Sequence, residues 1–301
     1  MTQDSTPAAS PKSGLPLLIV GLSTAAMSGA VMKGLAEELP AALIVWVRFT
    51  GFVLLMVPVV WWRKGRARML SPVMPLMQVV RGAMMAVGVM CFIVATRTLD
   101  FAEAITLLYI YPFIITLLAP FFLKEPPRLL TFLGVAGGFV GVLLVARPSG
   151  DGLMAAGTPF ALACGVLIAG QMLLNRRLGG TVDPLLTSFW GACVVAAMLT
   201  PFAPWIWEAI DAGQAARLAL IAAMAAVSQT FVTIAFARSP AAELAPFTYV
   251  EIVAGVAIGF AVFGTLPDAL SFVGMGIIVA SGVMVARIQR GRITARRQPK
   301  I

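Results

Sequence analysis

Long runs of apolar residues, separated by short polar turns, follow one another along the whole chain. A hydrocarbon layer about 30 Å thick needs roughly 20 apolar residues per spanning helix. Windows of that length predict ten membrane-spanning helices, at residues 15–33, 40–62, 73–95, 102–122, 128–146, 153–174, 184–204, 216–236, 241–263 and 268–286. These spans and their turns use up nearly the whole chain, so we expect no soluble domain.

Composition supports an all-α integral membrane protein. Hydrophobic residues make up 60% of the chain and charged residues only 12%, whereas a soluble domain carries about 25% charged residues. Such a chain cannot be surrounded by water on all sides. The polar leader 1–14 has Lys12 as its only basic residue, so we do not expect the first span to be a cleaved signal peptide.

The excess of basic residues, 22 Lys and Arg against 13 Asp and Glu, is distributed unevenly between the two sides of the predicted membrane. With the N-terminus inside, sixteen basic residues lie on the cytoplasmic side and four on the other, and Arg48 and Arg81 lie within spans. This is the positive-inside bias, and it predicts that both termini are cytoplasmic. The positive charge therefore indicates contact with anionic lipid headgroups and not with nucleic acid.

An internal repeat appears when the chain is shifted by 140 residues against itself. Residues 95–147 then match residues 235–287 without a gap at eleven of 53 positions, including Tyr109 with Tyr249. We therefore divide the chain into a cytoplasmic tail at 1–14, a first repeat at 15–148, a second repeat at 152–287 and a basic cytoplasmic tail at 288–301.

Each repeat holds five spans, an odd number, so the two repeats must cross the membrane in opposite orientations. Inverted repeats are typical of secondary transporters, which bind substrate near the midplane and expose it to each side in turn. The architecture therefore favours a carrier over a receptor or a structural protein.

Residues 81–148, which begin RGAMMAVGVMCF, resemble the first repeat of the EamA-type carriers of the drug/metabolite transporter superfamily, and the likeness continues through residues 222–287. The resemblance implies ten helices in two inverted five-helix repeats. It also implies a central cavity lined by helices 1, 3, 4, 6, 8 and 9, and small-metabolite substrates, often exported amino acids. The family's Gly-Glu-x-Pro turn is only partly kept: residues 124–127 read Lys-Glu-Pro-Pro, and residues 264–267 read Gly-Thr-Leu-Pro.

Ionisable residues at membrane depth are the first candidates for a role in transport, because each costs about 2.5–3.5 kcal/mol at a helix centre. Glu251 lies in the middle of the ninth predicted span, Arg48 near the middle of the second and Arg81 about two turns into the third. Glu251 is interpreted as a site for a proton or a substrate ammonium group, and one arginine as a partner for a substrate carboxylate. The alternative is that Glu251 pairs with an arginine and fixes helix packing, and we favour a structural role for Arg48.

The repeat makes the candidate site asymmetric, because the shift of 140 residues places Glu251 opposite Tyr111. A single carboxyl facing aromatic hydroxyls suits an amphoteric or cationic substrate. Further polar candidates lie on the helices expected to line the cavity: Thr24, Ser28, Tyr109, Gln171, Asn175, Gln229, Thr233 and Thr248. For the Ser and Thr residues, an interhelical hydrogen bond is the alternative that we favour.

Pro112 and Pro246 lie inside the fourth and ninth predicted spans, where each removes a helical hydrogen bond and permits a bend. Gating hinges and static kinks are both open interpretations.

No phosphate-binding G-x-x-x-x-G-K-[ST] motif occurs, so transport driven by ATP hydrolysis is not expected. The chain has no His and only three Cys, all within spans, so we expect neither a metal site nor a cofactor, and an enzyme would lack obvious catalytic groups. The predicted function is export of amino acids or related amphoteric metabolites, with protons as a second coupling partner, by a monomer or a homodimer. Uptake of S-adenosylmethionine, a vitamin or a cationic drug is the alternative, and a lipid flippase or a helper subunit is the alternative outside the carriers.

Overall fold

The computed structural model describes residues 14–123, 129–146, 155–178, 183–239 and 244–297. Within these ranges the structure is helical and contains no strand. The helices that form the spans are α1 (Leu15–Ala36), α2 (Ala41–Lys64), α4 (Pro75–Thr96), α5 (Phe101–Leu108), α6 (Tyr111–Leu123), α7 (Leu129–Ala146), α8 (Thr158–Leu178), α9 (Pro184–Leu199), α11 (Ala212–Arg238), α13 (Val250–Phe263) and α14 (Ala269–Arg297). Short connecting elements are α3 (Arg66–Leu70), η2 (Thr200–Phe202) and α10 (Ala203–Ile206), and the 3₁₀ helix η3 (Ala245–Tyr249) leads into α13.

The predicted spans are confirmed as helices. Six helical segments of the described chain are long and apolar enough to cross a membrane, and four shorter apolar segments occupy the remaining predicted spans. Span four is divided into α5 and α6, and span nine consists of η3 followed by α13. The last helix is longer than predicted, because α14 continues to Arg297 through most of the segment assigned to the basic tail.

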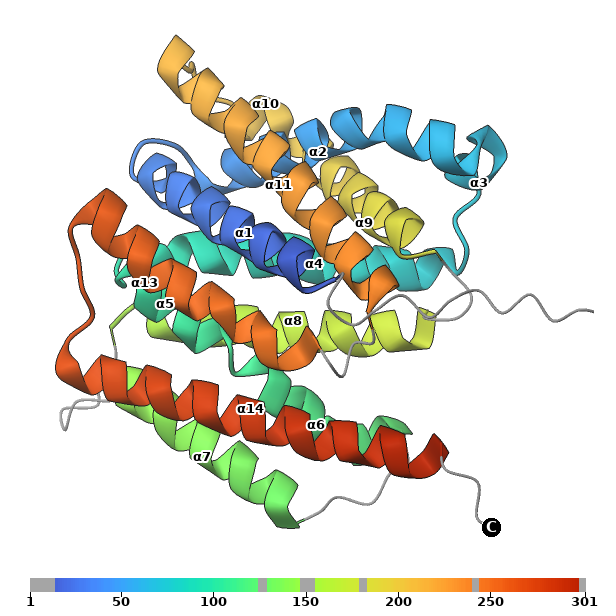
Figure 1. Ribbon diagram of the computed structural model, residues 1–301. Helices are drawn as coiled ribbons and strands as arrows, with labels where there is room; N and C mark the ends of the chain where they lie inside the picture. Colours follow the sequence, from blue (N-terminus) through green and yellow to red (C-terminus); the bar gives the residue numbers. More distant parts are fainter. Residues whose placement is uncertain (1–13, 124–128, 147–154, 179–182, 240–243, 298–301) are drawn as a thin grey trace, which may run out of the picture.

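The two halves are interleaved, and helices of one half pack against helices of the other in repeat-related pairs. Helix α1 of the first half packs along α11 of the second, and α4 packs along α8 in the equivalent way. In Figure 1 the spans of the first half lie beside those of the second, with α2, α9 and α11 at one side of the bundle and α7 and α14 at the other. Helix α1 and its counterpart α8 run in opposite directions across the bundle, as inverted repeats require.

The fifth helices of the two halves, α7 and α14, touch along their backbones. A Cβ added to Gly141 would lie 2.7 Å from the carbonyl oxygen of Gly274, and a Cβ added to Gly274 would lie 2.7 Å from that of Gly141. Small residues allow this approach, which gives membrane helices their dispersion contacts in the absence of a hydrophobic driving force. Gly141 and Gly274 therefore belong to a packing surface between the two halves.

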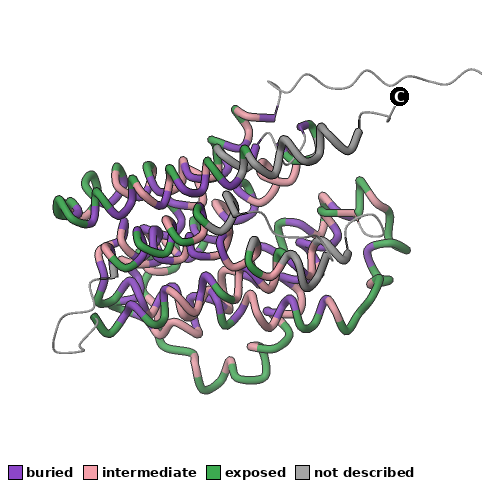
Figure 2. The backbone as a smooth tube through the Cα atoms, turned by 90° about the horizontal axis from the view of Figure 1, so that it is seen from below, coloured by how far each residue is buried: buried purple, intermediate pink, exposed green. Residues whose placement is uncertain are grey.

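The outside of the bundle is apolar, as a lipid-facing surface must be. Large hydrophobic side chains on many helices are exposed, among them Leu54 and Leu76, while the buried positions face inward (Figure 2). Trp62 at the end of α2 is 92% exposed and Trp205 in α10 is 80% exposed. Tryptophans at helix ends are typical of the membrane–water interface.

Several sequence predictions lie outside the described residues. These are nearly all of the N-terminal tail, the last four residues of the C-terminal tail and the turn at 124–127. The corresponding turn of the second half is described: α13 ends at Phe263, and the next residue, Gly264, has φ 67°, a backbone conformation that favours glycine.

Candidate functional site: a tyrosine–glutamate cluster at two helix breaks

Two membrane spans are interrupted at equivalent positions of the repeat. In span four, α5 ends at Leu108, and the amides of Tyr109 and Ile110 bond to the carbonyls three residues earlier, at 3.1 and 3.2 Å. In span nine, Ala245–Tyr249 form a 3₁₀ helix before α13 begins. Pro112 is the second residue of α6 and Pro246 the second of η3, so both predicted bends are breaks between segments. Broken helices are where transporters place polar backbone groups at membrane depth.

The hydroxyl of Tyr109 joins the two breaks. Its oxygen lies 2.7 Å from the backbone carbonyl oxygen of Thr248 and 2.7 Å from a carboxyl oxygen of Glu251. The ring centroid of Tyr109 lies 5.3 Å from that of Tyr111 and 5.4 Å from that of Tyr249. Tyr109 therefore contacts both of the other tyrosines of the chain and the carboxyl group of Glu251. We call Tyr109, Tyr111, Thr248, Tyr249 and Glu251 the tyrosine–glutamate cluster.

Glu251 is the second residue of α13, which packs against α1 and α5. Among the described residues, no Lys or Arg forms an ion pair with it. The hydroxyl of Tyr109 contacts its carboxyl group, and the thiol of Cys164 on α8 is close enough to interact with it electrostatically. The site therefore presents one acidic group to hydroxyls, aromatic rings and a thiol, at the interface between the two halves.

The arginines lie elsewhere, so the predicted ion pair with Glu251 is not formed. Arg81 on α4 is 5% exposed and donates hydrogen bonds to the carbonyl oxygen of Thr187 on α9 and to the side chain of Gln78. Arg48 on α2 donates to the sulfur of Met32 at 3.0 Å. Both guanidinium groups lack a carboxylate partner within the described part of the chain. Neither residue joins the cluster.

The remaining candidates fall into two groups. Thr24 bonds to the carbonyl oxygen of Val20 on its own helix, at 2.7 Å, which is the ordinary structural role for a threonine in a membrane helix. Gln229 donates to Ser188 of α9 at 2.8 Å and lies 3.5 Å from the hydroxyl of Thr233. Of these contacts, the one between Gln229 and Ser188 joins two helices, and the other two lie within a single helix.

Ser28 and Asn175 differ from the candidates above, because each has a buried side-chain oxygen that lacks a hydrogen-bond partner among the described residues. Gln171 lies one helical turn before Asn175 on α8 and is half-buried. All three belong to spans that pack at the centre of the bundle, but the structure does not bring them into the cluster.

Sequence reasoning missed the polar contacts at the helix ends. Lys64 at the end of α2 pairs with Asp183, whose carboxyl also accepts the amide of Leu185 and so caps α9. Burial raises the pKa of Asp183, but the hydrogen bonds from Lys64 and the backbone outweigh burial and hold this pKa below its ordinary value. These residues are far apart in the sequence, so only the packing of α2 against α9 could reveal the pair.

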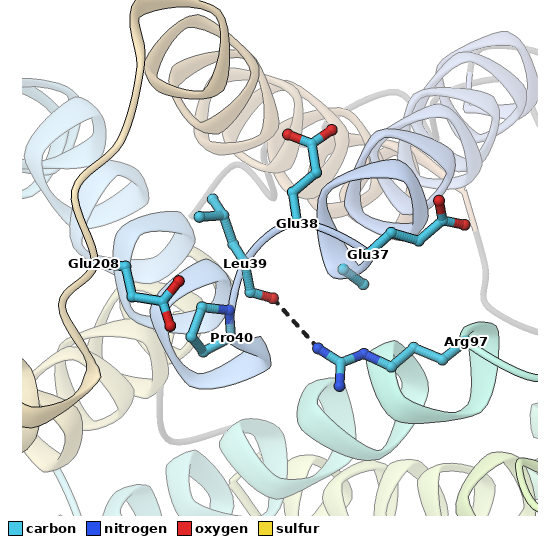
Figure 3. A pocket seen from close by; sticks show the side chains of 7 residues that line it. Glu37, Glu38, Leu39, Pro40, Arg97 and Glu208 are labelled. Atoms are coloured by element: carbon cyan, nitrogen blue, oxygen red, sulfur yellow. Dashed lines mark hydrogen bonds between the residues drawn. The ribbon is translucent and has the colours of Figure 1, made fainter.

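At the opposite end of the bundle, Glu38 accepts two hydrogen bonds from Arg217, both 2.7 Å long, and one from Gln214. These hydrogen bonds lower the pKa of Glu38. A hollow of about 640 Å³ opens beside them, lined by Glu37, Glu38 and Glu208 as well as Arg97, which donates to the carbonyl oxygen of Leu39 (Figure 3). The hollow lies at the bundle surface and is separate from the tyrosine–glutamate cluster.

A model of the EamA-like transporter family matches the chain twice, over residues 12–147 and 155–287. The two matches coincide with the two five-helix halves and together cover most of the chain. The chain belongs to the EamA-like transporter family.

Several relatives of this EamA-like transporter are themselves named as carriers. It is 26% identical over 285 residues to a pseudopaline exporter of Pseudomonas aeruginosa, covering 93% of this chain and 98% of the relative. It is 27% identical to a riboflavin transporter of Rhizobium johnstonii, covering 72% of each chain. It is 21% identical to an S-adenosylmethionine uptake transporter of Rickettsia conorii, covering 90% of this chain and 92% of the relative.

The fold of the EamA-like transporter also occurs in a solved crystal structure with 17% sequence identity. That structure superimposes with a TM-score of 0.64 and covers 94% of this chain and 100% of its own. The protein is thus a multi-pass membrane transporter of small molecules with the two-repeat fold of its family.

Proposed function

We propose that this EamA-like transporter is a secondary carrier of the bacterial inner membrane that exports amino acids or related amphoteric metabolites by alternating access. The observation that carries the proposal is the tyrosine–glutamate cluster, which lies where two repeat-related helices are broken and where the two halves meet. Glu251 receives the cationic group of the substrate, and the rings of Tyr109, Tyr111 and Tyr249 surround it. Aromatic faces attract ammonium groups by about 0.5–2 kcal/mol, most strongly where water is excluded.

The number of protons available for the hydrogen bonds of Tyr109 supports proton coupling. The hydroxyl of Tyr109 has one proton but lies 2.7 Å from two acceptors, the carbonyl of Thr248 and the carboxyl of Glu251. If Tyr109 donates to the carbonyl, a proton on Glu251 completes the second hydrogen bond. The other titratable groups of the surroundings are Tyr111, Tyr249 and the thiol of Cys164, and no Lys or Arg is among the described neighbours. We infer that Glu251 holds a proton in this conformation and exchanges it for the substrate.

Export is favoured over uptake by the relative named as a pseudopaline exporter. Uptake is the second candidate, because other relatives are named as carriers of riboflavin and of S-adenosylmethionine. A sulfonium or quaternary ammonium group would suit the same carboxyl and rings, so the cluster serves both candidates. The orientation, with both termini in the cytoplasm, rests on the count of sixteen basic residues against four.

Counterflow in proteoliposomes tests the proposal. Purified protein should exchange a labelled amino acid or metabolite with no other component present, and substrate addition should drive a proton flux that an internal pH dye detects. A hydrogen bond to a charged group contributes ~1.5–3 kcal/mol, so Glu251→Gln should slow exchange at least about tenfold and abolish the proton flux. Glu103→Gln is the matched control, because Glu103 lies on α5 and bonds to Ser271 of α14, outside the cluster.

The outcomes separate the alternatives. Chemical conversion of the compound would indicate an enzyme, movement of labelled lipid a flippase, and no activity without a second protein a helper subunit. Exchange by Glu251→Gln at the wild-type rate at every pH would remove Glu251 from the mechanism.

A further inference from the structure

Arg81 and Gln78 form a second polar centre, away from the tyrosine–glutamate cluster. Both are on α4, three residues apart, and they are 5% and 1% exposed. The guanidinium lies directly against α9, since a Cβ added to Gly191 would be 2.6 Å from its Nη1 atom. The same Nη1 atom makes both hydrogen bonds of Arg81, to the carbonyl of Thr187 and to the side-chain oxygen of Gln78.

This centre has more hydrogen-bond donors than hydrogen-bond acceptors. Nε of Arg81 and Nε2 of Gln78 are both buried, and neither has a hydrogen-bond partner among the described residues. The two acceptors that Arg81 does have are neutral, and its charge faces no carboxylate in the described structure. A buried donor left without an acceptor is costly, and a buried charge without a counter-charge more so. Two such donors at positions i and i+3 share one face of the helix.

Arg48 provides the contrast within the same bundle. Its Nε is also buried without a partner, but its other contacts are the sulfur of Met32 and the ring of Phe49. No second unpartnered amide donor accompanies it on its helix face. Of these two arginines, Arg81 alone has a second unpartnered donor, the amide of Gln78, on its helix face. A charged and a neutral donor side by side can bind the two oxygens of one anion.

The position of this centre separates it from the tyrosine–glutamate cluster. Arg81 is the seventh residue of α4, about two helical turns from its start. Its guanidinium contacts α9, whereas Glu251 lies on α13, which packs against α1 and α5. Arg81 is therefore near the end of the bundle where α4 begins, and the two sites are built on different helices.

We propose that Arg81 and Gln78 form a binding site for a small carboxylate anion, between α4 and α9 and distinct from the tyrosine–glutamate cluster. A carboxylate there would accept from Nε of Arg81 and from Nε2 of Gln78 and would neutralise the guanidinium. The site would hold the acidic group of a solute approaching from the predicted cytoplasmic side. It goes beyond the proposed function, because it does not depend on Glu251.

Thermal unfolding of the full-length protein in detergent tests this site, with succinate as the probe and chloride at equal ionic strength as the reference. Saturating succinate should raise the apparent midpoint by about 2–4 °C. Gln78→Leu removes one donor and should reduce the shift by at least half. Gln78→Glu places a carboxylate beside Arg81, so it should keep or raise the midpoint in chloride and abolish the response to succinate.

Two controls keep the test decisive. Gln229→Leu removes an amide that already bonds to Ser188, so its succinate response should equal that of the wild type. Glu251→Gln should also keep the response, which separates this site from the proposed transport site. Calorimetric titration of the wild-type protein decides the question even if a variant is unstable: no binding of millimolar succinate, or a full response in Gln78→Glu, overturns the proposal.

Discussion

The hydroxyl of Tyr109 is the group whose removal tests the cluster most directly. Tyr109→Phe keeps the ring and its contacts with Tyr111 and Tyr249, at 5.3 and 5.4 Å between centroids. It deletes only the oxygen that contacts the carbonyl of Thr248 and the carboxyl of Glu251. Any change in stability or transport therefore belongs to the hydroxyl and not to the packing of the ring.

Two contributions set the expected loss of stability for Tyr109→Phe. Hydrogen bonds between membrane helices contribute only ~0.6 kcal/mol on average, whereas a buried acceptor left without a donor costs ~1–3 kcal/mol. The unsatisfied acceptor dominates, and the total is about 1.5–3.5 kcal/mol. One kcal/mol moves the midpoint of a chain of this size by roughly 2 °C, so the apparent unfolding temperature should fall by about 3–7 °C.

The matched control for this variant is Tyr249→Phe, the equivalent change in the other half. Tyr249 lies against the backbone of α14, since a Cβ added to Gly282 would be 1.8 Å from its hydroxyl. In the described part of the chain it makes no hydrogen bond to Glu251. Unfolding is followed for the purified variants in detergent, and counterflow is measured in liposomes. Equal midpoints and equal exchange rates for wild type and Tyr109→Phe would refute the assignment of the hydroxyl to the site.

Two further predictions concern packing and pH. Gly274→Ala should destabilise the protein by ~1–3 kcal/mol through overpacking against α7. Gly276 has open space where a Cβ would lie, so Gly276→Ala should be neutral or stabilise the protein by up to ~1 kcal/mol through helix propensity. Thermal unfolding midpoints compare the two variants, and equal effects would contradict the close contact. Because the pKa of Asp183 is lower in the folded state, its pair with Lys64 stabilises the fold above the unfolded pKa of about 4 and is lost as the pH falls through the lower folded value. Asp183→Asn keeps the helix cap and removes only the ion pair. The free energy of unfolding should therefore fall by up to ~1 kcal/mol at pH 7, because the pair is partly exposed, and should not change below the folded pKa. A difference in unfolding midpoint between wild type and variant that persists in acid would contradict this prediction.

The fold was largely predictable because the bilayer imposes its thickness on the sequence. An apolar window of about 20 residues has few interpretations other than a spanning helix. The internal repeat predicted that the chain consists of two related halves of opposite orientation. The breaks at Tyr109 and in η3 were foreseen as bends at Pro112 and Pro246. Their exact place was not, because a proline disfavours helix for the residue before it without fixing where the helix ends.

The partners of the charged residues were harder to predict. Glu251 was identified from its cost in the membrane, but the choice between Arg81 and a tyrosine depends on the rotation of α4 and α13 about their axes. A sequence without aligned relatives carries no signal for that rotation. Gln78 was overlooked for a related reason, since a glutamine near the end of a span looks interfacial until its helix is seen buried against α9.

Tyr109 and Tyr249 occupy equivalent positions of the two halves, and their rings touch. A residue can meet its own repeat counterpart only near the axis that relates the halves, and points on that axis stay in place when the halves exchange shapes. Under the alternating access that we propose, this contact would serve as a pivot between the two halves. A solute bound beside it would not have to travel through the protein, because each phase in turn would open to it.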